Sequence, residues 1–374
     1  MVLERTERRD VARIALAHDY LTQRGGAERV TSVLCEAFPG RPLFTSVFEP
    51  SQTFSSFEHV DVHTTWLQHV RAFRHDPRRA VALLAPAFSS LHVDADVVVA
   101  SSSGWAHGIG TDAKVLVYCH APARWLYQAA RYQGDVPGRF STAAKLAGSA
   151  LRRPLTAWDQ KAARRADRYV VNSSAIARQV KSVYGIEAQV VAPPPALEPI
   201  GASTAVRGIE EGFVLTVSRL LPYKNVGTVL DLARRRPSQQ FVVVGQGPLA
   251  GALARDAPRN VVLLGTVSES ELRWLYANAV ALLAPSYEDF GLTPLEAAGF
   301  ATPTVALRAG GYLDTIIEGE TGTFFDTLDV TAVDDALAQL LRSPPSVEAL
   351  TTQARRFSRA TFIDRLHALV DELL

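Results

Sequence analysis

The chain has little of what marks a secreted, disulfide-linked or membrane-spanning protein. Only two of its 374 residues are cysteine, Cys35 and Cys119. Two are too few for a disulfide framework, which favours a reducing compartment. No apolar run approaches the roughly 18 residues that a spanning helix needs. The first ten residues, MVLERTERRD, are charged and lack the apolar core of a signal peptide. We therefore expect a cytoplasmic protein with a loose N-terminal segment.

A large net charge is also missing, although the charges are unevenly spread. The formal net charge is +1, but residues 1–200 hold 24 Lys and Arg against 18 Asp and Glu, and residues 201–350 hold 11 against 17. Within residues 121–170, ten basic residues meet only three acidic ones. Such a run is usually a solvated helical face, and the alternative is contact with an anionic partner or membrane surface. Nucleic acid is not expected, because the run contains no recognisable reading motif.

The pattern of apolar and polar stretches predicts an α/β protein. Several short apolar runs end in Ser, His, Asp or Asn, as do the strands of a parallel sheet that helices cover on both faces. The expected strands of the first half are RIALAHD (13–19), ADVVVASSS (95–103), KVLVYCH (114–120), RYVVNSS (168–174) and QVVAPP (189–194). Those of the second half are GFVLTVSR (212–219), QFVVVGQG (240–247), VVLLGTV (261–267), VALLAPS (280–286) and TPTVAL (302–307).

The length and a break between the two series predict two domains. Single domains usually hold about 100–200 residues, and PPPALEPIGAS (193–203) is a linker candidate. We predict one doubly wound domain over 1–198 and a second over 199–354. The last stretch, about 355–374, has apolar residues at helical spacing and is expected to close the N-terminal domain. Doubly wound sheets bind ligands at the carboxyl ends of their strands, so a site is expected in a cleft between the domains.

Glycine and histidine follow two strands of the first half. Gly25 and Gly26 allow backbone N–H groups to approach a ligand, and the helix expected near Ala27 directs its positive end the same way. An ordinary glycine turn would explain the pair as well, and the spacing is not the G-x-G-x-x-G of dinucleotide binding. His120 ends another strand, where a histidine is more often structural than catalytic. Cys119 beside it has no second ligand pair at zinc spacing.

Two cations and two glycines follow strands of the second half. Arg219 and Lys224 lie just beyond a strand, on either side of a turn that contains proline. They would suit a diphosphate, because Arg can donate to two oxygens at once and Lys acts as a point charge. Ordinary surface charge is the alternative. Gly245 and Gly247 follow the next strand and are a weak signal alone.

The stretch YEDFGLTPLEAAGF (287–300) carries two glutamates in different surroundings. Thr293 and Glu296 have the spacing of a capping box, with a proline between them, so Glu296 is expected to help start a helix. Glu288 lies before that helix and has no such role. Gly291 between them would leave unpaired N–H groups at the positive helix end. Such a site would bind a negative group at the helix end and hydroxyl groups at the two carboxylates. A nucleotide sugar carries both kinds of group.

Together these motifs resemble the retaining glycosyltransferases of family 4, which have the GT-B fold of two Rossmann-like domains. The resemblance covers nearly the whole chain and keeps the family's order: GGAERV, CHAPARWLY, VSRLLPYKN, GQG, the E-x7-E pair and GGYLDTI. The segments HDYLTQRGGAERV, YCHAPARWLY and VNSS are similar to bacterial α-mannosyltransferases, many of which use GDP-mannose. The family often has Glu where Asp314 stands in GGYLDTI, so this position departs from the family pattern.

The resemblance implies roles for the matching positions. Glu296 would hold the nucleotide ribose, Glu288 would contact the donor sugar, and His120 would reach that sugar from the N-terminal domain. Four groups would surround the diphosphate: the side chains of Arg219 and Lys224 and the backbone N–H groups of Gly291 and Leu292. Three glycines would border the donor or the cleft: Gly25, Gly26 and Gly245. Acceptor contacts are expected in the loop between Gly108 and Lys114 and in the region 131–150, neither of which carries a motif.

The implied reaction is transfer of mannose from GDP-mannose to a glycan or glycolipid hydroxyl, with an α linkage and without a metal or other cofactor. Asp94-Ala95-Asp96 reads as the D-x-D of another glycosyltransferase fold, but it precedes the strand VVVA and is interpreted as accidental. A UDP-sugar donor, carrying glucose or N-acetylglucosamine, stays open, as does a silent nucleotide-sugar-binding subunit. A dinucleotide oxidoreductase is not favoured, because no G-x-G-x-x-G follows a strand.

Overall fold

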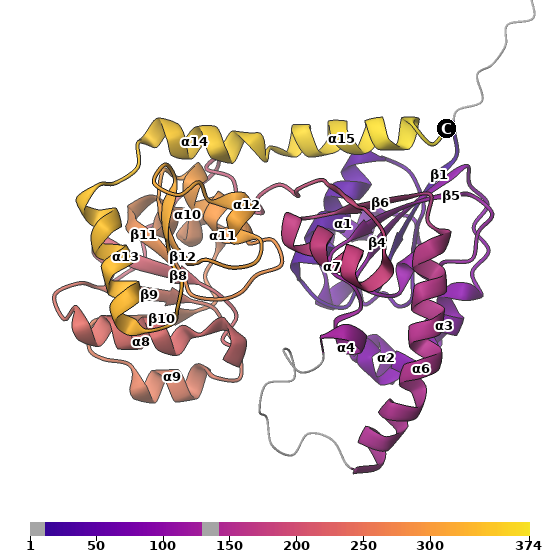
Figure 1. Ribbon diagram of the computed structural model, residues 1–374, viewed down its shortest axis with the longest axis horizontal. Helices are drawn as coiled ribbons and strands as arrows, with labels where there is room; N and C mark the ends of the chain where they lie inside the picture. The colour runs from indigo at the N-terminus through magenta and orange to yellow at the C-terminus, as the bar shows by residue number, and fades with distance from the viewer. Residues whose placement is uncertain (1–11, 129–141) are drawn as a thin grey trace, which may run out of the picture.

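Two parallel sheets form the two halves of the protein (Figure 1). The computed structural model describes residues 12–128 and 142–374, with side chains from residue 151 onward in the second range. The first sheet has the strand order β3-β2-β1-β4-β5-β6-β7 and the second the order β10-β9-β8-β11-β12-β13. Every strand pairing in both sheets is parallel. The predicted α/β class with two doubly wound, Rossmann-like sheets is therefore confirmed.

Most strands coincide with the predicted apolar runs. The first sheet contains β1 (Ile14–His18), β2 (Leu43–Thr45), β3 (Val62–Thr64), β4 (Val97–Ser102), β5 (Lys114–Cys119), β6 (Arg168–Val171) and β7 (Gln189–Val190). The second contains β8 (Phe213–Val217), β9 (Phe241–Val244), β10 (Val261–Gly265), β11 (Ala279–Ala284), β12 (Thr304–Leu307) and β13 (Gly322–Phe325). The sequence analysis does not predict β2, β3 or β13, because each is only three or four residues long and gives no clear period.

Helices cover both faces of the first sheet and bury its apolar residues. One face packs against α3 (Val81–Ser89), α6 (Thr142–Arg165) and α7 (Ser174–Tyr184). The other face packs against α1 (Gly26–Ala37) and the last helix of the chain, α15 (Arg359–Asp371). The side chains of β4 and β5 are almost wholly buried, which explains why these strands read as continuous apolar runs.

The second sheet is covered in the same way. One face packs against α8 (Val226–Arg235), α9 (Ala250–Asp256) and α13 (Val330–Arg342). The other packs against α10 (Glu269–Asn278) and α11 (Leu292–Gly299). The remaining helices are α2 (Arg71–His75), α4 (Arg124–Tyr127), α12 (Tyr312–Thr315) and α14 (Val347–Arg356). Six 3-10 turns complete the described elements: η1 (Pro50–Gln52), η2 (Ser55–His59), η3 (Trp66–His69), η4 (Pro77–Ala80), η5 (Ala106–Gly108) and η6 (Pro222–Lys224).

The C-terminal helices link the two halves. Helix α14 contacts α11 of the second half, and α15 contacts α1 of the first. Figure 1 shows α14 and α15 running one after the other along one edge of both halves. The predicted boundary between residues 198 and 199 lies in the segment that joins β7 to β8, and its position there stays a prediction. The predicted loose N-terminal segment lies outside the described residues.

Each sheet reverses its strand order at one point. In the first sheet the reversal lies between β1 and β4, and in the second between β8 and β11. Such a reversal separates the two loops that leave the sheet in opposite directions, so a crevice opens at the carboxyl ends of those strands. The loops that follow β1, β4, β8 and β11 are therefore the places to look for a site. Within the described residues, no helix combines the length and the apolar character needed to cross a bilayer.

Candidate active site

The predicted residues Lys224 and Glu288 form an ion pair at the reversal point of the second sheet. Lys224 lies in η6, beyond β8, and its Nζ donates to Oε1 of Glu288 in the loop that follows β11. Ser286 Oγ donates to the same oxygen at 2.7 Å. The Lys224 side chain is only 9% exposed and that of Glu288 is 26% exposed. Glu288 Oε2 makes no hydrogen bond within the described residues, so it is the oxygen available for a ligand hydroxyl.

A second layer of polar groups holds the Glu288 loop in place. Ser286 Oγ gives its hydrogen to Glu288, so it accepts from Tyr312 OH at 3.1 Å. Asn225, next to Lys224, donates from Nδ2 to the Pro285 carbonyl at 2.9 Å. These bonds join the loops after β8 and β11, and they fix the position of the ion pair from both sides.

Two glycines allow the Glu288 loop to pack closely against the segment after β12. Gly311 N donates to the Glu288 carbonyl at 2.9 Å. A Cβ atom on Gly310 would lie 2.1 Å from that carbonyl oxygen, and φ at Gly310 is +63°. No other residue type fits there without moving the loop. The GGYLDTI motif thus has a clear structural role beside Glu288.

Arg219, the other predicted cation, is exposed at the end of β8. Its Nη2 donates to Tyr223 OH at 3.2 Å, and no carboxylate among the described residues forms an ion pair with it. The Tyr223 ring lies 5.0 Å from Lys224 Nζ. Tyr223 therefore contacts both cations, which places them on the same side of the crevice.

Helix α11 begins at Leu292, directly after Gly291, and this corrects the predicted helix start. Gly291 is the N-cap residue with φ +86°, and no side chain caps the helix. Because the left-handed conformation of Gly291 turns the chain into the helix early, Thr293 falls inside the first turn and cannot act as N-cap. The first N–H groups of α11, from Leu292 onward, have no side-chain cap, so they present a partial positive charge.

Glu296 does not form the predicted capping box. It is buried in α11, where its Oε2 accepts from Tyr276 OH at 2.7 Å and its Oε1 from Ala196 N at 3.2 Å. Burial raises the pKa of its carboxyl group. The capping prediction was wrong because it used local spacing, whereas the partners of Glu296 lie in α10 and in the segment between the sheets. Its predicted contact with a ribose stays a prediction.

The glycines after β9 also have packing roles. Gly245 has φ +146°, and a Cβ atom there would lie 1.9 Å from the Ser218 carbonyl oxygen. A Cβ atom on Gly247 would lie 2.3 Å from the Leu220 carbonyl oxygen. The GQG turn therefore packs directly on the loop that carries Arg219. The donor contact predicted for Gly245 stays a prediction.

A buried polar network occupies the reversal point of the first sheet. His120 follows β5, and its Nε2 lies 2.8 Å from Ser101 Oγ at the end of β4. Ser101 Oγ is also 3.0 Å from His18 Nδ1 and 2.9 Å from Thr31 Oγ1. Burial, and secondarily the neighbouring His18 and Arg124, lower the pKa of His120 to about 3. His120 is therefore a neutral hydrogen-bonding group at ordinary pH, and its Nδ1 has no hydrogen bond within the described residues.

A carboxylate that the sequence analysis does not predict lies behind this network. Glu28 of α1 is 1% exposed, its Oε1 accepts from Gln23 Nε2 at 2.9 Å, and that oxygen is 3.8 Å from His18 Nε2. Although burial acts the other way, the nearby His18 and the hydrogen bond from Gln23 lower the pKa of Glu28 overall. A Cβ atom on Gly25 would lie 2.4 Å from Glu28 Oε2, whereas one on Gly26 would meet open space. Gly25 thus makes room for Glu28.

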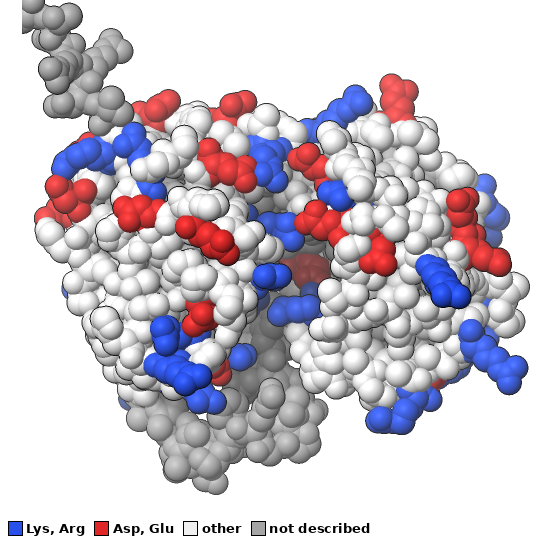
Figure 2. All heavy atoms as spheres, turned by 180° about the vertical axis from the view of Figure 1, so that it is seen from behind, with Lys and Arg blue, Asp and Glu red and all other residues white. Residues whose placement is uncertain are grey.

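Several polar contacts join the two halves beside these groups. Arg124 of α4 forms an ion pair with Asp289, the neighbour of Glu288. Ser173, the N-cap of α7, donates from Oγ to the Asp289 carbonyl. Asp314, which departs from the family pattern, accepts at Oδ2 from Ser174 N at 2.9 Å. Figure 2 shows the hollow between the halves, with charged side chains inside it.

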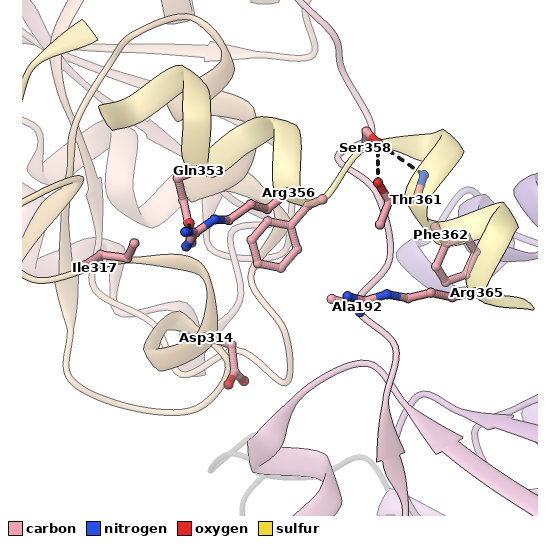
Figure 3. A pocket seen from close by; sticks show the side chains of 10 residues that line it. Ala192, Asp314, Ile317, Gln353, Arg356, Ser358, Thr361, Phe362 and Arg365 are labelled. Carbon is pink, nitrogen blue, oxygen red and sulfur yellow. Dashed lines mark hydrogen bonds between the residues drawn. The ribbon is translucent and has the colours of Figure 1, made fainter. Parts of the chain in front are cut away.

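Two cavities lie near these contacts. One, of about 260 Å³, lies where α14 passes into α15 and is lined by Ala192, Asp314, Ile317, Gln353, Arg356, Phe357, Ser358, Thr361, Phe362 and Arg365 (Figure 3). The other, of about 420 Å³, is lined by Tyr127, Gln128, Ala175, Arg178, Gln179, Ser182, Val183, Tyr287 and Gly310. Neither lining includes Glu288, Lys224 or His120, so these groups lie outside both cavities.

The remaining predictions concern metals and acceptor contacts. Asp94 and Asp96, the D-x-D pair, both bind the Arg13 guanidinium, at 2.7 and 3.0 Å. No group of three or more His, Cys, Asp or Glu side chains that could hold a metal occurs in the described part of the chain. The expected independence from metals stays a prediction. Most of the region 131–150, where acceptor contacts are expected, lies outside the described residues.

Comparison with known proteins agrees with this architecture. A family model described as Glycosyltransferase Family 4 matches residues 24–198, and one described as Glycosyl transferases group 1 matches residues 205–357. The solved structure of Anabaena Alr3699/HepE in complex with UDP and glucose superposes with a TM-score of 0.68 at 18% identity, covering 96% of this chain and 100% of that one. A sucrose-phosphate synthase from Thermosynechococcus elongatus gives a TM-score of 0.68 at 19% identity, covering 96% and 98%.

Curated relatives match only part of the chain. The D-inositol 3-phosphate glycosyltransferase of Mycobacterium avium is 33% identical over 229 residues, which is 55% of this chain and 54% of that protein. The same enzyme of Mycobacterium bovis BCG is 32% identical over 231 residues, covering 55% and 48%. The chain thus spans about half the length of the curated relatives it matches. None of these names specifies GDP-mannose. From the two family models, which match successive halves, the chain belongs to the group 1 and family 4 glycosyltransferases, with the GT-B fold.

Proposed function

We propose that the protein is a retaining glycosyltransferase that moves a hexose from a nucleoside diphosphate sugar to a saccharide or glycolipid hydroxyl. The Lys224–Glu288 ion pair carries the proposal, because it brings a cation and a carboxylate together at the reversal point of the second sheet. The cation would neutralise a diphosphate, and the carboxylate would accept hydrogen bonds from sugar hydroxyls. A silent nucleotide-sugar-binding subunit would have no need to keep both.

Some of these residues would contact the diphosphate leaving group, and the others would contact the sugar. Lys224, Arg219 and the uncapped start of α11 stabilise the negative charge that builds up on the diphosphate as the bond to the anomeric carbon breaks. Glu288 accepts hydrogen bonds from the donor sugar through Oε2. His120, neutral at ordinary pH, forms a hydrogen bond with the sugar from the opposite domain through Nδ1.

In the proposed reaction, the bond that breaks and the bond that forms lie on the same face of the sugar. The anomeric carbon loses its bond to the phosphate oxygen, and the acceptor oxygen forms a bond to the same carbon from the same side. The acceptor proton passes to the departing phosphate oxygen. The family resemblance supports this route, and it needs no enzyme nucleophile. Glu288 therefore orients the sugar and forms no covalent bond with it.

GDP-mannose is the first candidate donor, on the resemblance of the GGAERV and CHAPARWLY segments to bacterial mannosyltransferases. A UDP-sugar is the second candidate, because the HepE structure that this chain resembles was solved with UDP and glucose. The inositol phosphate glycosyltransferases among the relatives favour a small polar acceptor as an alternative to a glycan. Whether the protein binds guanine or uracil decides between these two donors.

A donor panel tests the proposal directly. GDP-mannose, UDP-glucose and UDP-N-acetylglucosamine are each tested for hydrolysis and for an increase in melting temperature. A ligand at a hundredfold excess over its Kd stabilises the fold by about 2.7 kcal/mol, so the correct donor is expected to stand out. Stabilisation without turnover, even with acceptors present, would indicate the silent subunit. If no donor is hydrolysed or raises the melting temperature, the proposal is wrong.

Glu288→Gln separates chemistry from folding. The variant is expected to lose transfer at least about a hundredfold, since a positioned charged group typically contributes that much, with a nearly unchanged melting temperature. Glu187→Gln is the matched control, because Glu187 is also a glutamate paired with a lysine, but on the exposed surface of the N-terminal half. Equal activity of the two variants would contradict the role given to Glu288.

A further inference from the structure

Three large apolar side chains are exposed within one short stretch of the N-terminal half. Trp66 is 47% exposed, Val70 is 39% exposed and Leu83 is 37% exposed. They lie on η3, before α2 and on α3, and these short elements pack on one another in series through η4. Single exposed apolar residues are common on protein surfaces, whereas these three lie within 18 residues, on elements that pack in series.

Three exposed arginines lie in the same stretch of the chain as these apolar side chains. Arg71, Arg78 and Arg79 are all exposed, and no exposed acidic residue lies between Trp66 and Leu83. Asp76, the acidic residue of this stretch, is engaged locally, since its Oδ1 accepts from Arg78 Nε at 2.7 Å and from Arg78 N at 3.3 Å. Figure 2 shows Lys and Arg side chains gathered at the lower end of the N-terminal half. We call the six residues Trp66, Val70, Arg71, Arg78, Arg79 and Leu83 the docking surface.

This surface is more promising for an anionic partner than the basic run 121–170. Several arginines of that run are used within the fold: Arg168 pairs with Glu372, Arg165 donates to the Thr111 carbonyl and Arg152 donates to the Leu126 carbonyl. Two others, at 131 and 139, lie outside the described residues. Arg71, in contrast, forms no ion pair with any described residue, while Arg78 and Arg79 share the single carboxylate of Asp76.

The combination of side chains selects the partner. Tryptophan and aliphatic side chains are stabilised when they enter the boundary between lipid headgroups and acyl chains. Arginines are stabilised by anionic headgroups. A nucleic acid would attract the arginines but would offer nothing to Val70 and Leu83. The docking surface therefore complements a bilayer in both charge and polarity.

We propose that the docking surface attaches the protein to an anionic membrane. Phe73 of α2 packs against the apolar cluster that contains Leu126 of α4, and Arg124 of α4 reaches Asp289 next to the Glu288 loop. Attachment through α2 would therefore hold this part of the N-terminal half, with the Arg124 contact, near the lipid headgroups. An acceptor carried by a lipid could then reach the site without leaving the bilayer. The attachment itself does not depend on the proposed reaction.

Vesicle co-sedimentation tests the attachment without any donor or acceptor. The full chain is mixed with vesicles of phosphatidylglycerol or of phosphatidylcholine, at about 0.1 M and about 1 M salt. The Debye screening length falls from about 10 Å to about 3 Å between these salt concentrations. Binding to phosphatidylglycerol at low salt, reduced at high salt and absent with phosphatidylcholine, is the expected result. Failure to bind phosphatidylglycerol overturns the proposal, whatever the donor panel shows.

Variants then locate the surface. Arg71→Glu combined with Arg79→Glu is expected to weaken vesicle binding at least about 25-fold, because each arginine near an anionic surface contributes about fivefold. Arg255→Glu combined with Arg259→Glu is the matched control, since both are exposed arginines of the other half. Equal weakening by both pairs would show general charge attraction and would overturn the assignment to this surface.

The apolar part needs its own variant. Trp66→Ser is expected to weaken binding to phosphatidylglycerol vesicles severalfold while the melting temperature stays within a degree or two of the parent. Val347→Ser is the control, because Val347 is 63% exposed and lies on α14. Transfer of Trp66 into lipid should also shift its fluorescence to shorter wavelength. No change in binding with Trp66→Ser would mean that an acidic protein surface fits this region as well as a membrane does, and the proposal would fall.

Discussion

Replacing His120 by glutamine is expected to flatten the acid side of the protein's stability curve. His120 is 6% exposed and is held at Nε2 by Ser101. Its pKa is lowered to about 3 from an ordinary 6.5, chiefly by burial. Between these two values the unfolded chain binds a proton that the folded chain does not. Stability therefore rises with pH across this window and is lost as pH falls through it.

The size of the effect follows from the shift. Each pH unit within the window corresponds to about 1.4 kcal/mol, so lowering the pH from 7 to 5 removes about 2 kcal/mol of unfolding free energy through His120 alone. In His120→Gln this contribution disappears, while an amide remains to bond with Ser101. Urea unfolding at pH 7 and pH 5 measures the difference between parent and variant. His59→Gln is the control, because His59 is exposed in the fold as it is in the unfolded chain.

Two outcomes would refute this reasoning. One is an unchanged difference in stability between pH 7 and pH 5 in His120→Gln. The other is an NMR titration in which the His120 ring takes up a proton near pH 6.5. Either would mean that burial does not keep His120 neutral, and its proposed role as a neutral hydrogen-bonding group would fail with it.

Two further substitutions test the second sheet. Glu296→Ala leaves the buried hydroxyl of Tyr276 without its acceptor, so we expect a loss of about 1–3 kcal/mol in urea unfolding together with weaker donor binding. Tyr276→Phe leaves Glu296 Oε2 without its donor, so the double variant, which removes both partners, should cost less than the sum of the single variants. Gly310→Ala is expected to displace the Glu288 loop, because the new Cβ atom would lie 2.1 Å from the Glu288 carbonyl oxygen, and transfer activity should fall at least about tenfold. Gly40→Ala has a similar φ of +70° with nothing within 4 Å, so it measures backbone strain alone, and equal activity losses would contradict the clash.

The strands that sequence alone could predict are those buried on both faces. Strands such as β4 and β5 are continuous apolar runs because helices cover them on both sides. Strand β3 is not predicted, since its three residues, VHT, are partly exposed and alternate too briefly to show a period. The architecture still follows from the longer strands, because their alternation with helices already requires parallel sheets.

The candidate site was predictable where a residue follows a strand, and only there. Lys224 and Glu288 follow neighbouring strands of one sheet, so the topology alone brings them together. Glu28 is not predicted, because it lies in the first turn of a helix and its neighbour His18 lies on a different element. Glu296 was given a local role because its sequence neighbours suggested one. Its true partners are 20 and 100 residues away, and no spacing rule reaches that far.

The contacts between the halves bear on how a donor would enter. Arg124, from the basic N-terminal half, forms an ion pair with Asp289. Asp314, from the acidic half, accepts a hydrogen bond from Ser174 N at the N-terminus of α7. Asp314 is partly exposed, but the Asp289 side chain is only 8% exposed, so breaking its pair with Arg124 would leave a buried charge without its partner. Separation of the halves therefore requires that water enter the hollow and solvate Asp289. Because Asp289 directly follows Glu288, opening would also release one end of the loop that holds Glu288 against Lys224. A donor that enters the open hollow would then meet Lys224 with its phosphates and Glu288 with its sugar, and closure would re-form the Arg124–Asp289 pair around the bound molecule.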